Sequence, residues 1–243
     1  MLRSNTYLFP FLLLFLVLLF CLVLNLSFGS VAIPFGDTFT SILGGKIENE
    51  SWHYIIWNYR IPKALTAVLV GSGLSLSGLL MQTLFRNPLA GPFVLGISSG
   101  ASLGAALLIM GSTLFSHWLI FEVINDVSLA IASSIGSFLV LLAVITVASR
   151  IKDTMALLII GLMFGSITAA LVSVLSYFTD ADKLQQYIFW AFGSVGNISG
   201  TQLALLAVFI LIGVILSIIS LKSLNALLMC ENYSRSIGFH LKK

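Results

Sequence analysis

Long apolar runs that alternate with short polar segments are the dominant pattern of this chain. A helix needs about 20 mainly apolar residues to cross a hydrocarbon core about 30 Å thick. The runs close to this length are residues 7–28, 61–84, 93–111, 127–148, 155–178 and 202–221. The pattern therefore predicts an all-α fold, a polytopic membrane helix bundle of about six transmembrane helices, in a single domain over residues 1–243.

Composition agrees with a membrane setting. Hydrophobic residues make up 58% of the 243 residues and charged residues only 9%, whereas a soluble domain carries roughly a quarter charged residues. The net charge of +3 includes no basic run of the kind that binds nucleic acid, so no nucleic-acid partner is expected. Two cysteines, Cys21 and Cys230, give no disulfide framework.

The polar segments between the runs carry their own predictions. The first run is expected to be a retained span rather than a signal peptide, because it exceeds a signal core in length and no small-residue cleavage site follows it. Residues 29–58 are too polar to span and are expected to be aqueous, with room for an interfacial helix around residues 38–43. Residues 179–201 indicate an exposed loop with a partly inserted helix that ends near residues 192–194.

Small residues and prolines mark where helices end and where they meet. Pro88 and Pro92 lack the N–H that a helix needs, so one span is expected to end near Phe85 and the next to begin near Pro92. Small residues one helical turn apart, such as Gly96, Gly100 and Gly104 in the third span or Gly71 with Ser75 and Gly73 with Ser77 in the second, let a neighbouring helix approach to backbone contact. The second span is therefore expected to be enclosed by helices rather than lipid. The glycines expected at such contacts are Gly71, Gly73, Gly78, Gly96, Gly100 and Gly104.

Orientation follows from the distribution of Lys and Arg, because the side of the membrane that retains more positive charge is normally cytoplasmic. A cytoplasmic N-terminus divides these residues eight to four between inside and outside. The inside set is Arg3, Arg86, Arg150, Lys152, Lys222, Arg235, Lys242 and Lys243, and the outside set is Lys46, Arg60, Lys63 and Lys183.

The sequence offers little for catalysis. His53, His117 and His240 lie in expected loops or in the tail without metal-binding spacing, so no metal or cofactor is expected to be bound directly. Ser98 and Ser99 lack a base at similar depth and are interpreted as residues of a helix contact. All 21 charged residues lie in loops or at span ends, whereas channels and secondary transporters usually carry ionisable groups within spans. Energy or substrate selection is therefore expected from outside these helices.

The C-terminal segment, residues 223–240, changes character. Leu224, Leu227 and Leu228 have helical spacing, and residues 232–237 can form a second short helix stopped by Gly238. Two short cytoplasmic helices would make a docking knob for a partner. A plain linker to a following span is the alternative.

Three blocks of this sequence resemble the permeases of ABC importers for iron compounds, the FecCD-like family that imports ferric siderophores, haem and cobalamin. The first block is residues 60–63, RIPK, with residues 71–105, which contain FRNPLAGPFVLGISSGASLGA. The second is FWAFGS at residues 189–194, and the third is residues 231–238. Departures are glycine at position 91 and Cys230 and Asn232 in place of a common glycine and glutamate. The family typically has ten spans, so the chain resembles the front part of a permease and is expected, alone, to insert without transporting.

The resemblance implies a permease of a bacterial cell membrane that does no bond chemistry itself. Its expected partners are an ABC ATPase dimer that holds ATP and Mg, an extracytoplasmic substrate-binding protein and a second permease chain. The implied cargo is a ferric siderophore, with haem or cobalamin as alternatives. A non-transporting membrane scaffold or remnant, or an intramembrane enzyme, is the alternative of a different class.

The resemblance also implies residue roles. Arg60 and Lys63 are expected as an exposed pair that docks the binding protein, with interfacial anchoring as the alternative. The expected ATPase-coupling residues are Leu227, Leu228, Glu231, Ser234, Arg235 and Gly238. The expected packing or gating residues, for which static packing is the alternative, are Gly71, Gly73, Gly78, Arg86, Asn87, Pro88, Gly96, Gly100 and Gly104.

Overall fold

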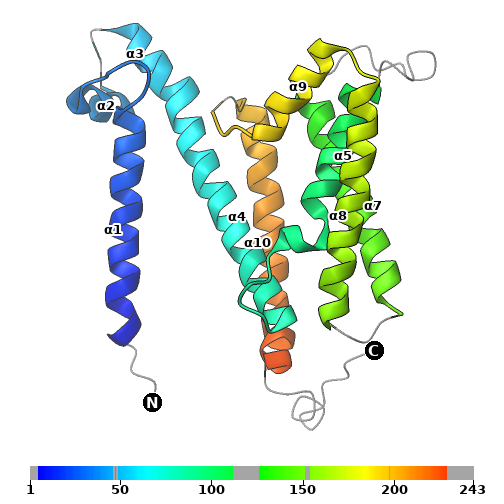
Figure 1. Cartoon of the computed structure of the whole chain (residues 1–243). Helices are drawn as coiled ribbons and strands as arrows, with labels where there is room; N and C mark the ends of the chain where they lie inside the picture. Colours follow the sequence, from blue (N-terminus) through cyan, green and yellow to red (C-terminus); the bar gives the residue numbers. More distant parts are fainter. Residues whose placement is uncertain are drawn as a thin grey trace. The chain divides into compact units, whose positions relative to one another are not determined.

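The computed structural model describes residues 5–45, 47, 49–111, 126–150, 154–196 and 198–228, and these residues include no strand. The all-α class predicted from the sequence is confirmed (Figure 1). The helices are α1 (Asn5–Ser27), α2 (Phe35–Ile42), α3 (Glu50–Ile55), the π-helical turn η1 (Ile56–Arg60), α4 (Ile61–Phe85), the 3₁₀ turn η2 (Pro92–Leu95), α5 (Ile97–Ile109), α7 (Asp126–Ala148), α8 (Thr154–Tyr177), α9 (Ala181–Phe192) and α10 (Gly200–Leu228).

Five helical stretches of the described chain are long and apolar enough to cross a membrane. They are Tyr7–Ser27, Glu50–Phe85, Val127–Val147, Ala156–Tyr177 and Gly200–Asn225. The expected span at residues 93–111 differs, because α5 has only 13 residues. At 1.5 Å per residue it is about 20 Å long, which is shorter than the hydrocarbon core of about 30 Å.

Gly96 is the reason why residues 93–111 do not form one helix. Its φ of 75° is left-handed, so it ends η2 and precedes the first turn of α5. A residue with a Cβ adopts this conformation at a cost, whereas glycine adopts it freely. Gly96 therefore lies at a break and not on a helical stripe with Gly100 and Gly104.

The second expected span begins earlier than its hydropathy suggests. Helix α3, η1 and α4 follow one another without a gap from Glu50 to Phe85, where the sequence predicts an aqueous segment up to residue 58. The π turn is located directly before Pro62, and its last bond runs from the Ile61 N–H to the Ile56 carbonyl. In a regular α-helix the proline ring would press on the carbonyl four residues earlier, which gives a physical reason for a wider turn at this place.

Helix α9 ends where the sequence predicts, whereas α10 continues further than predicted. The expected helix within residues 179–201 is α9, which ends at Gly193 with a φ of 72°. Helix α10 continues to Leu228, seven residues beyond the predicted end at residue 221. The segment expected to couple to an ATPase thus begins as a continuation of a helix rather than as a separate knob.

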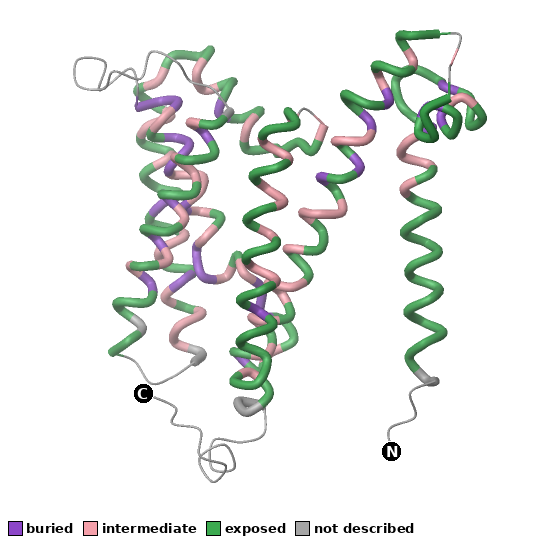
Figure 2. Tube along the Cα trace, turned by 180° about the vertical axis from the view of Figure 1, so that it is seen from behind, coloured by how far each residue is buried: buried purple, intermediate pink, exposed green. Residues whose placement is uncertain are grey.

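The contacts of the chain group its residues into two compact units, and the single permease domain expected from the sequence stays a prediction. Unit 1 contains residues 1–71 and 195–210, and unit 2 contains residues 72–194 and 211–243. In unit 1, most of α1 is exposed, as Figure 2 shows, with Phe9 at 72% and Phe11 at 71%. Such a surface suits a helix surrounded by lipid, where apolar side chains lose nothing by being exposed.

Helix α2 is held in unit 1 by side chains of the following helical stretch. The Ser41 hydroxyl, fully buried, is hydrogen-bonded to His53 Nδ1 at 2.9 Å, and Trp57 Nε1 donates to the Ser41 carbonyl at 3.3 Å. His53 belongs to α3, whereas the sequence predicts a loop at this position. These bonds fix the polar connection between α1 and α4 within the protein.

In unit 2, α5 packs against α7, and η2 packs against α8, at the distance of backbone contact. A Cβ at Gly100 would lie 2.6 Å from the Gly136 carbonyl oxygen, and a Cβ at Gly104 would meet the carbonyl of Ala132. Helix α8 makes a similar contact, because a Cβ at Gly161 would meet the Val94 carbonyl. Lipid supplies no hydrophobic drive for helix association, so close van der Waals contact of this kind is what holds such helices together.

Two buried clusters surround this contact. One contains Ala105, Ala106, Ile109, Met110, Leu129 and Tyr187, and the other contains Phe85, Ala90, Leu95, Val140 and Val144. The glycines of α4 lie in a different environment: no described atom beyond its own helix and chain neighbours lies within 4 Å of a Cβ built at Gly71 or Gly78. The enclosing helices expected for the second span are therefore not provided at these positions by the described part of the chain.

The substitution Gly100→Ala is expected to lower the thermal stability of the purified protein, because the added methyl group collides with the Gly136 carbonyl. Overpacking of this kind costs about 1–3 kcal/mol. The matched control is Gly78→Ala, which adds the same group in open space and is expected to leave the melting temperature unchanged or slightly raised. Equal effects of both substitutions would contradict the close contact between α5 and α7.

Candidate functional site

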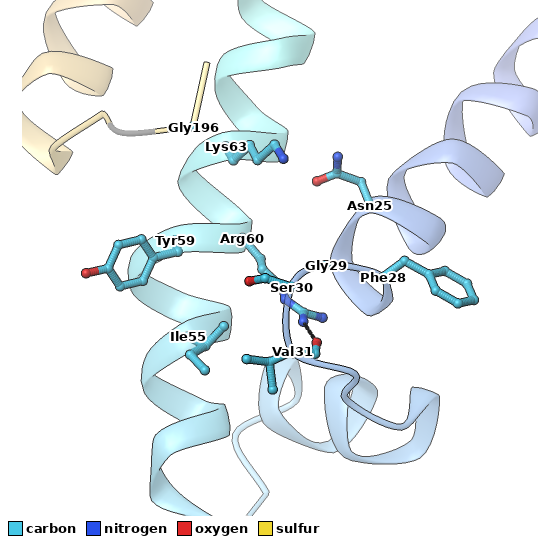
Figure 3. A pocket seen from close by; sticks show the side chains of 10 residues that line it. All are labelled: Asn25, Phe28, Gly29, Ser30, Val31, Ile55, Tyr59, Arg60, Lys63 and Gly196. Atoms are coloured by element: carbon cyan, nitrogen blue, oxygen red, sulfur yellow. Dashed lines mark hydrogen bonds between the residues drawn. The ribbon is translucent and has the colours of Figure 1, made fainter. Parts of the chain in front are cut away.

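Arg60 is the centre of a polar corner in unit 1. It is the last residue of η1 and is only 6% exposed. Its Nη1 atom donates to the carbonyls of Leu26 at 2.6 Å and Ser27 at 2.7 Å, and its Nη2 atom donates to the Val31 carbonyl (Figure 3). Arg60 thereby joins the end of α1 and the segment after it to the helix that leads into α4.

A pocket of about 370 Å³ opens beside this guanidinium. It is lined by Asn25, Phe28, Gly29, Ser30, Val31, Ile55, Tyr59, Arg60, Lys63 and Gly196, all of unit 1. The Asn25 Oδ1 atom is buried without a hydrogen-bond partner among the described residues. Figure 3 shows the Asn25 and Lys63 side chains extending toward one another. The pocket therefore presents one exposed cation and one unpaired acceptor.

Arg60 and Lys63 do not form the exposed pair that the sequence predicts. Lys63 is exposed, but Arg60 is buried. The reason is that the free carbonyls at the end of α1 lie within reach of the guanidinium, and an arginine that donates to carbonyls can be buried where a free cation could not. This corrects the expected exposure of Arg60, while a docking role of this corner stays a prediction.

The turn between α4 and η2 holds Arg86, Asn87 and Pro88 in a defined conformation. Arg86 has a left-handed φ of 47°, which is uncommon for a residue other than glycine. The Asn87 side chain accepts from the Leu89 N–H at 2.9 Å, and Gln82 Nε2 donates to the Pro88 carbonyl at 3.0 Å. The side chain of Leu89 at the tip is 85% exposed.

The flanks of this turn are anchored in the protein. Phe85 on one side is 6% exposed and Ala90 on the other is 4% exposed, and both belong to one buried cluster. The turn therefore lies between two buried residues, and its backbone polar groups are bonded to Gln82 and Asn87. Its expected role in packing or gating stays a prediction.

Helix α9 is tied to α5 by a contact that sequence patterns did not reveal. The Ser102 and Tyr187 hydroxyls are hydrogen-bonded to each other, and Tyr187 is 9% exposed. Its ring stacks on Trp190 with centroids 6.3 Å apart. The one sequence feature that could have indicated this contact is the amphipathic pattern of α9, because it places Tyr187 and Trp190 three residues apart on one face.

The remaining predicted residues lie near the end of the chain. Leu227 and Leu228 belong to α10. Glu231, Ser234, Arg235 and Gly238 lie outside the described residues. Within the described part of the chain, no three side chains of His, Cys, Asp or Glu come together in a way that could hold a metal ion.

Comparison with known proteins adds to this geometry. The model of the FecCD transport family matches residues 16–243. The chain is 33% identical over 242 residues to the vitamin B12 import system permease protein BtuC of Klebsiella pneumoniae. The aligned region covers 98% of this chain and 66% of BtuC. It is also 32% identical over 215 residues to the hemin transport system permease protein HmuU of Yersinia pestis. Here the aligned region covers 85% of this chain and 60% of HmuU.

A solved structure assigned to a metal-chelate type ABC transporter in an inward-facing conformation superposes with a TM-score of 0.77 and 26% identity, over 98% of this chain and 69% of the other. The helical fold is thus that of ABC transporter permeases. The chain belongs to the FecCD transport family. It spans 66% of the length of BtuC and 60% of HmuU.

The substitution Asn87→Ala is expected to release the Leu89 amide, because it removes the acceptor at the tip of the turn. A hydrogen bond of this type contributes about 1 kcal/mol, so amide exchange at Leu89 should be faster by roughly fivefold. Asn87→Asp retains the Oδ1 acceptor and is the matched control. An unchanged exchange rate at Leu89 in Asn87→Ala would contradict the observed role of the side chain.

Proposed function

We propose that the chain is a permease subunit of an ATP-driven importer and that its cargo is a ferric siderophore. The observation that carries the proposal is the match of the FecCD transport family to residues 16–243. The names of two relatives refer to vitamin B12 and hemin, and the solved structure is assigned to a metal-chelate type transporter. Each of these cargoes is a metal ion enclosed by an organic ligand, which is also the chemistry of a ferric siderophore.

The proposed partners follow from the family to which the chain belongs. An ATPase dimer that holds ATP and Mg would supply the energy, and the permease itself would do no bond chemistry. An extracytoplasmic binding protein would select the cargo, and a second permease chain would complete the passage. No cofactor is proposed to bind this chain directly.

The proposed location is the inner membrane of a bacterium with the N-terminus in the cytoplasm. The excess of Lys and Arg on that side supports the orientation. It places the turn with Asn87 and the end of α10 on the cytoplasmic side, and the corner with Lys63 on the outer side. The glycine contacts of α5 would then lie between the two sides, where small displacements of packed helices change access.

The proposed coupling segment is residues 223–240, with Leu227, Leu228, Glu231, Ser234, Arg235 and Gly238 as contacts of the ATPase. Helix α10 enters this segment without a break up to Leu228. A helix that continues from the membrane into a docking segment transmits a push along its axis, which supports a role in coupling.

The experiment is ATP-dependent uptake by the permease together with its ATPase, binding protein and any further permease chain. A labelled ferric siderophore is compared with labelled haem and cobalamin in the same proteoliposomes. Faster uptake of the siderophore is the expected result. Uptake of cobalamin or haem alone would contradict the proposed siderophore cargo. Uptake that does not require ATP would contradict the proposal of an ATP-driven importer.

The substitution Arg235→Glu is expected to lower ATP-dependent uptake by at least about tenfold, which corresponds to ~1.4 kcal/mol of coupling free energy. The amount of permease in the membrane should stay the same, because the reversed charge lies in the proposed docking segment and not in a span. Quantitative blotting of membranes provides that control. Normal uptake by the variant would remove Arg235 from the coupling contacts.

A further inference from the structure

Helix α2 has its apolar side chains on the outside and its polar side chains against the protein. Phe35 and Phe39 are 51% and 65% exposed, and Leu43, directly after the helix, is 73% exposed. The buried side chains of α2 are instead Thr38 and Ser41. A helix on a protein surface in water is arranged the other way round, with its apolar face toward the core. The outward face of α2 is therefore suited to apolar surroundings.

The side chains of α2 fall into three arcs around the helix axis. Each residue turns the helix by about 100°, so side chains three or four positions apart share an arc. The exposed apolar arc is Phe35, Phe39 and Ile42, the buried arc is Thr38 and Ser41, and the third arc, in which no residue is buried, is Gly36, Asp37 and Thr40. Such a division fits a helix that meets hydrocarbon, protein and water on different sides.

The C-terminal end of α2 obtains its hydrogen bonds from the protein. The Gly45 N–H donates to the Thr40 carbonyl at 2.8 Å, and the Gly44 N–H donates to the Ser41 carbonyl at 3.2 Å. Gly44 has a left-handed φ of 78°, which allows this closed helix end. Backbone groups that are bonded within the protein can lie at a membrane boundary without a large cost.

The apolar arc of α2 continues the exposed surface of α1. The Phe35 ring packs edge-to-face on Phe28, directly after α1, with ring centroids 5.8 Å apart. Helix α1 has 23 residues and is therefore about 34 Å long, enough to cross a hydrocarbon core of about 30 Å. The chain has thus reached the boundary of the core at Phe28, and Figure 1 shows α2 beside this end of α1.

We propose that α2 is an interfacial helix whose apolar arc inserts among the acyl chains of membrane lipids at the boundary where α1 ends. Lipid is the occupant that the contacts favour, because the arc is continuous through Phe28 with the exposed apolar surface of a spanning helix. The proposal requires only the membrane setting of α1 and does not rest on the proposed import function.

The bonds of the buried arc give this contact a consequence for the rest of unit 1. Ser41 is hydrogen-bonded to His53 of α3 and accepts from Trp57 of η1. The lipid contact on one arc and these bonds on another would hold α3 and η1 at a fixed depth relative to the membrane boundary.

The test compares spin labels on adjacent residues of different arcs. Phe39→Cys and Thr40→Cys are made separately in a Cys21→Ser, Cys230→Ser background, labelled with a nitroxide and placed in phosphatidylcholine nanodiscs. Neither Phe39 nor Thr40 is buried, so no buried contact is removed. Oxygen concentrates among acyl chains and a neutral nickel chelate stays in water. The ratio of oxygen to nickel collision rates is expected to be at least about fivefold higher at position 39 than at position 40.

Two outcomes at position 39 would overturn the proposal. Nickel access equal to that at position 40 would place the apolar arc in water. A label closed to both oxygen and nickel would show that protein covers the arc, either a second copy or another part of the assembly. The pair Leu43→Cys and Gly36→Cys repeats the comparison, with position 43 expected to behave like 39 and position 36 like 40. The reverse order in this pair would also overturn the proposal.

Discussion

The carbonyl and N–H groups of the backbone must find partners inside the protein wherever water is absent, and three helix ends of the described chain show how such partners are provided. At the end of α1 the partner is the Arg60 guanidinium. After α4 the partners are the side chains of Gln82 and Asn87, and at the end of α9 the backbone turns through Gly193. Arg60, Gln82 and Asn87, which the hydropathy pattern assigns to the ends of spans or to the segments between them, are therefore bonded parts of the fold.

Close contact between backbones is the second feature that follows from the membrane setting. Helices that gain little from hydrophobic association rely on contact area and on good fit. Gly100 and Gly136 provide that fit between α5 and α7, and Gly161 provides it between α8 and η2. A contact this close leaves few intermediate positions, so a movement of α5 would shift its neighbours as a body. This property suits a family of transporters, whose helices must change access without opening gaps.

The corner with Arg60 and the turn with Asn87 show two solutions to the same task. In each case a short segment is fixed by hydrogen bonds and by anchored flanks and still has exposed side chains, among them Lys63 in the first and Leu89 in the second. A fixed segment with an exposed side chain loses little conformational entropy when a partner binds. Both segments are thus fixed by the fold, while a docking role of either stays a prediction.

The sequence by itself determined the class of the fold, since hydropathy and the length of apolar runs are local properties that do not depend on how the chain is arranged. The sequence also predicted α9 from the composition of residues 179–201. The close contacts of Gly100 and Gly104 were predicted as well, because residues four apart on a helix lie on one face. The helix boundaries at Glu50 and Leu228 were missed, because polar residues at the ends of a span resemble loop residues when only composition is considered.

Only the tertiary structure decided the roles of Arg60, Gly96 and Tyr187. Arg60 meets carbonyls 29 to 34 residues away and Ser102 meets Tyr187 across 85 residues, and no sequence period relates such positions. Gly96 looks like the first residue of a helical stripe, but its left-handed φ depends on η2 and on the packing of Val140 and Gly161 around it. From the sequence alone Arg60 is expected at the surface, but in the structure it is buried against the carbonyls at the end of α1. Hydrogen-bond partners and backbone conformation at helix ends depend on the path of the whole chain, and for that reason they were decided only when the chain folded.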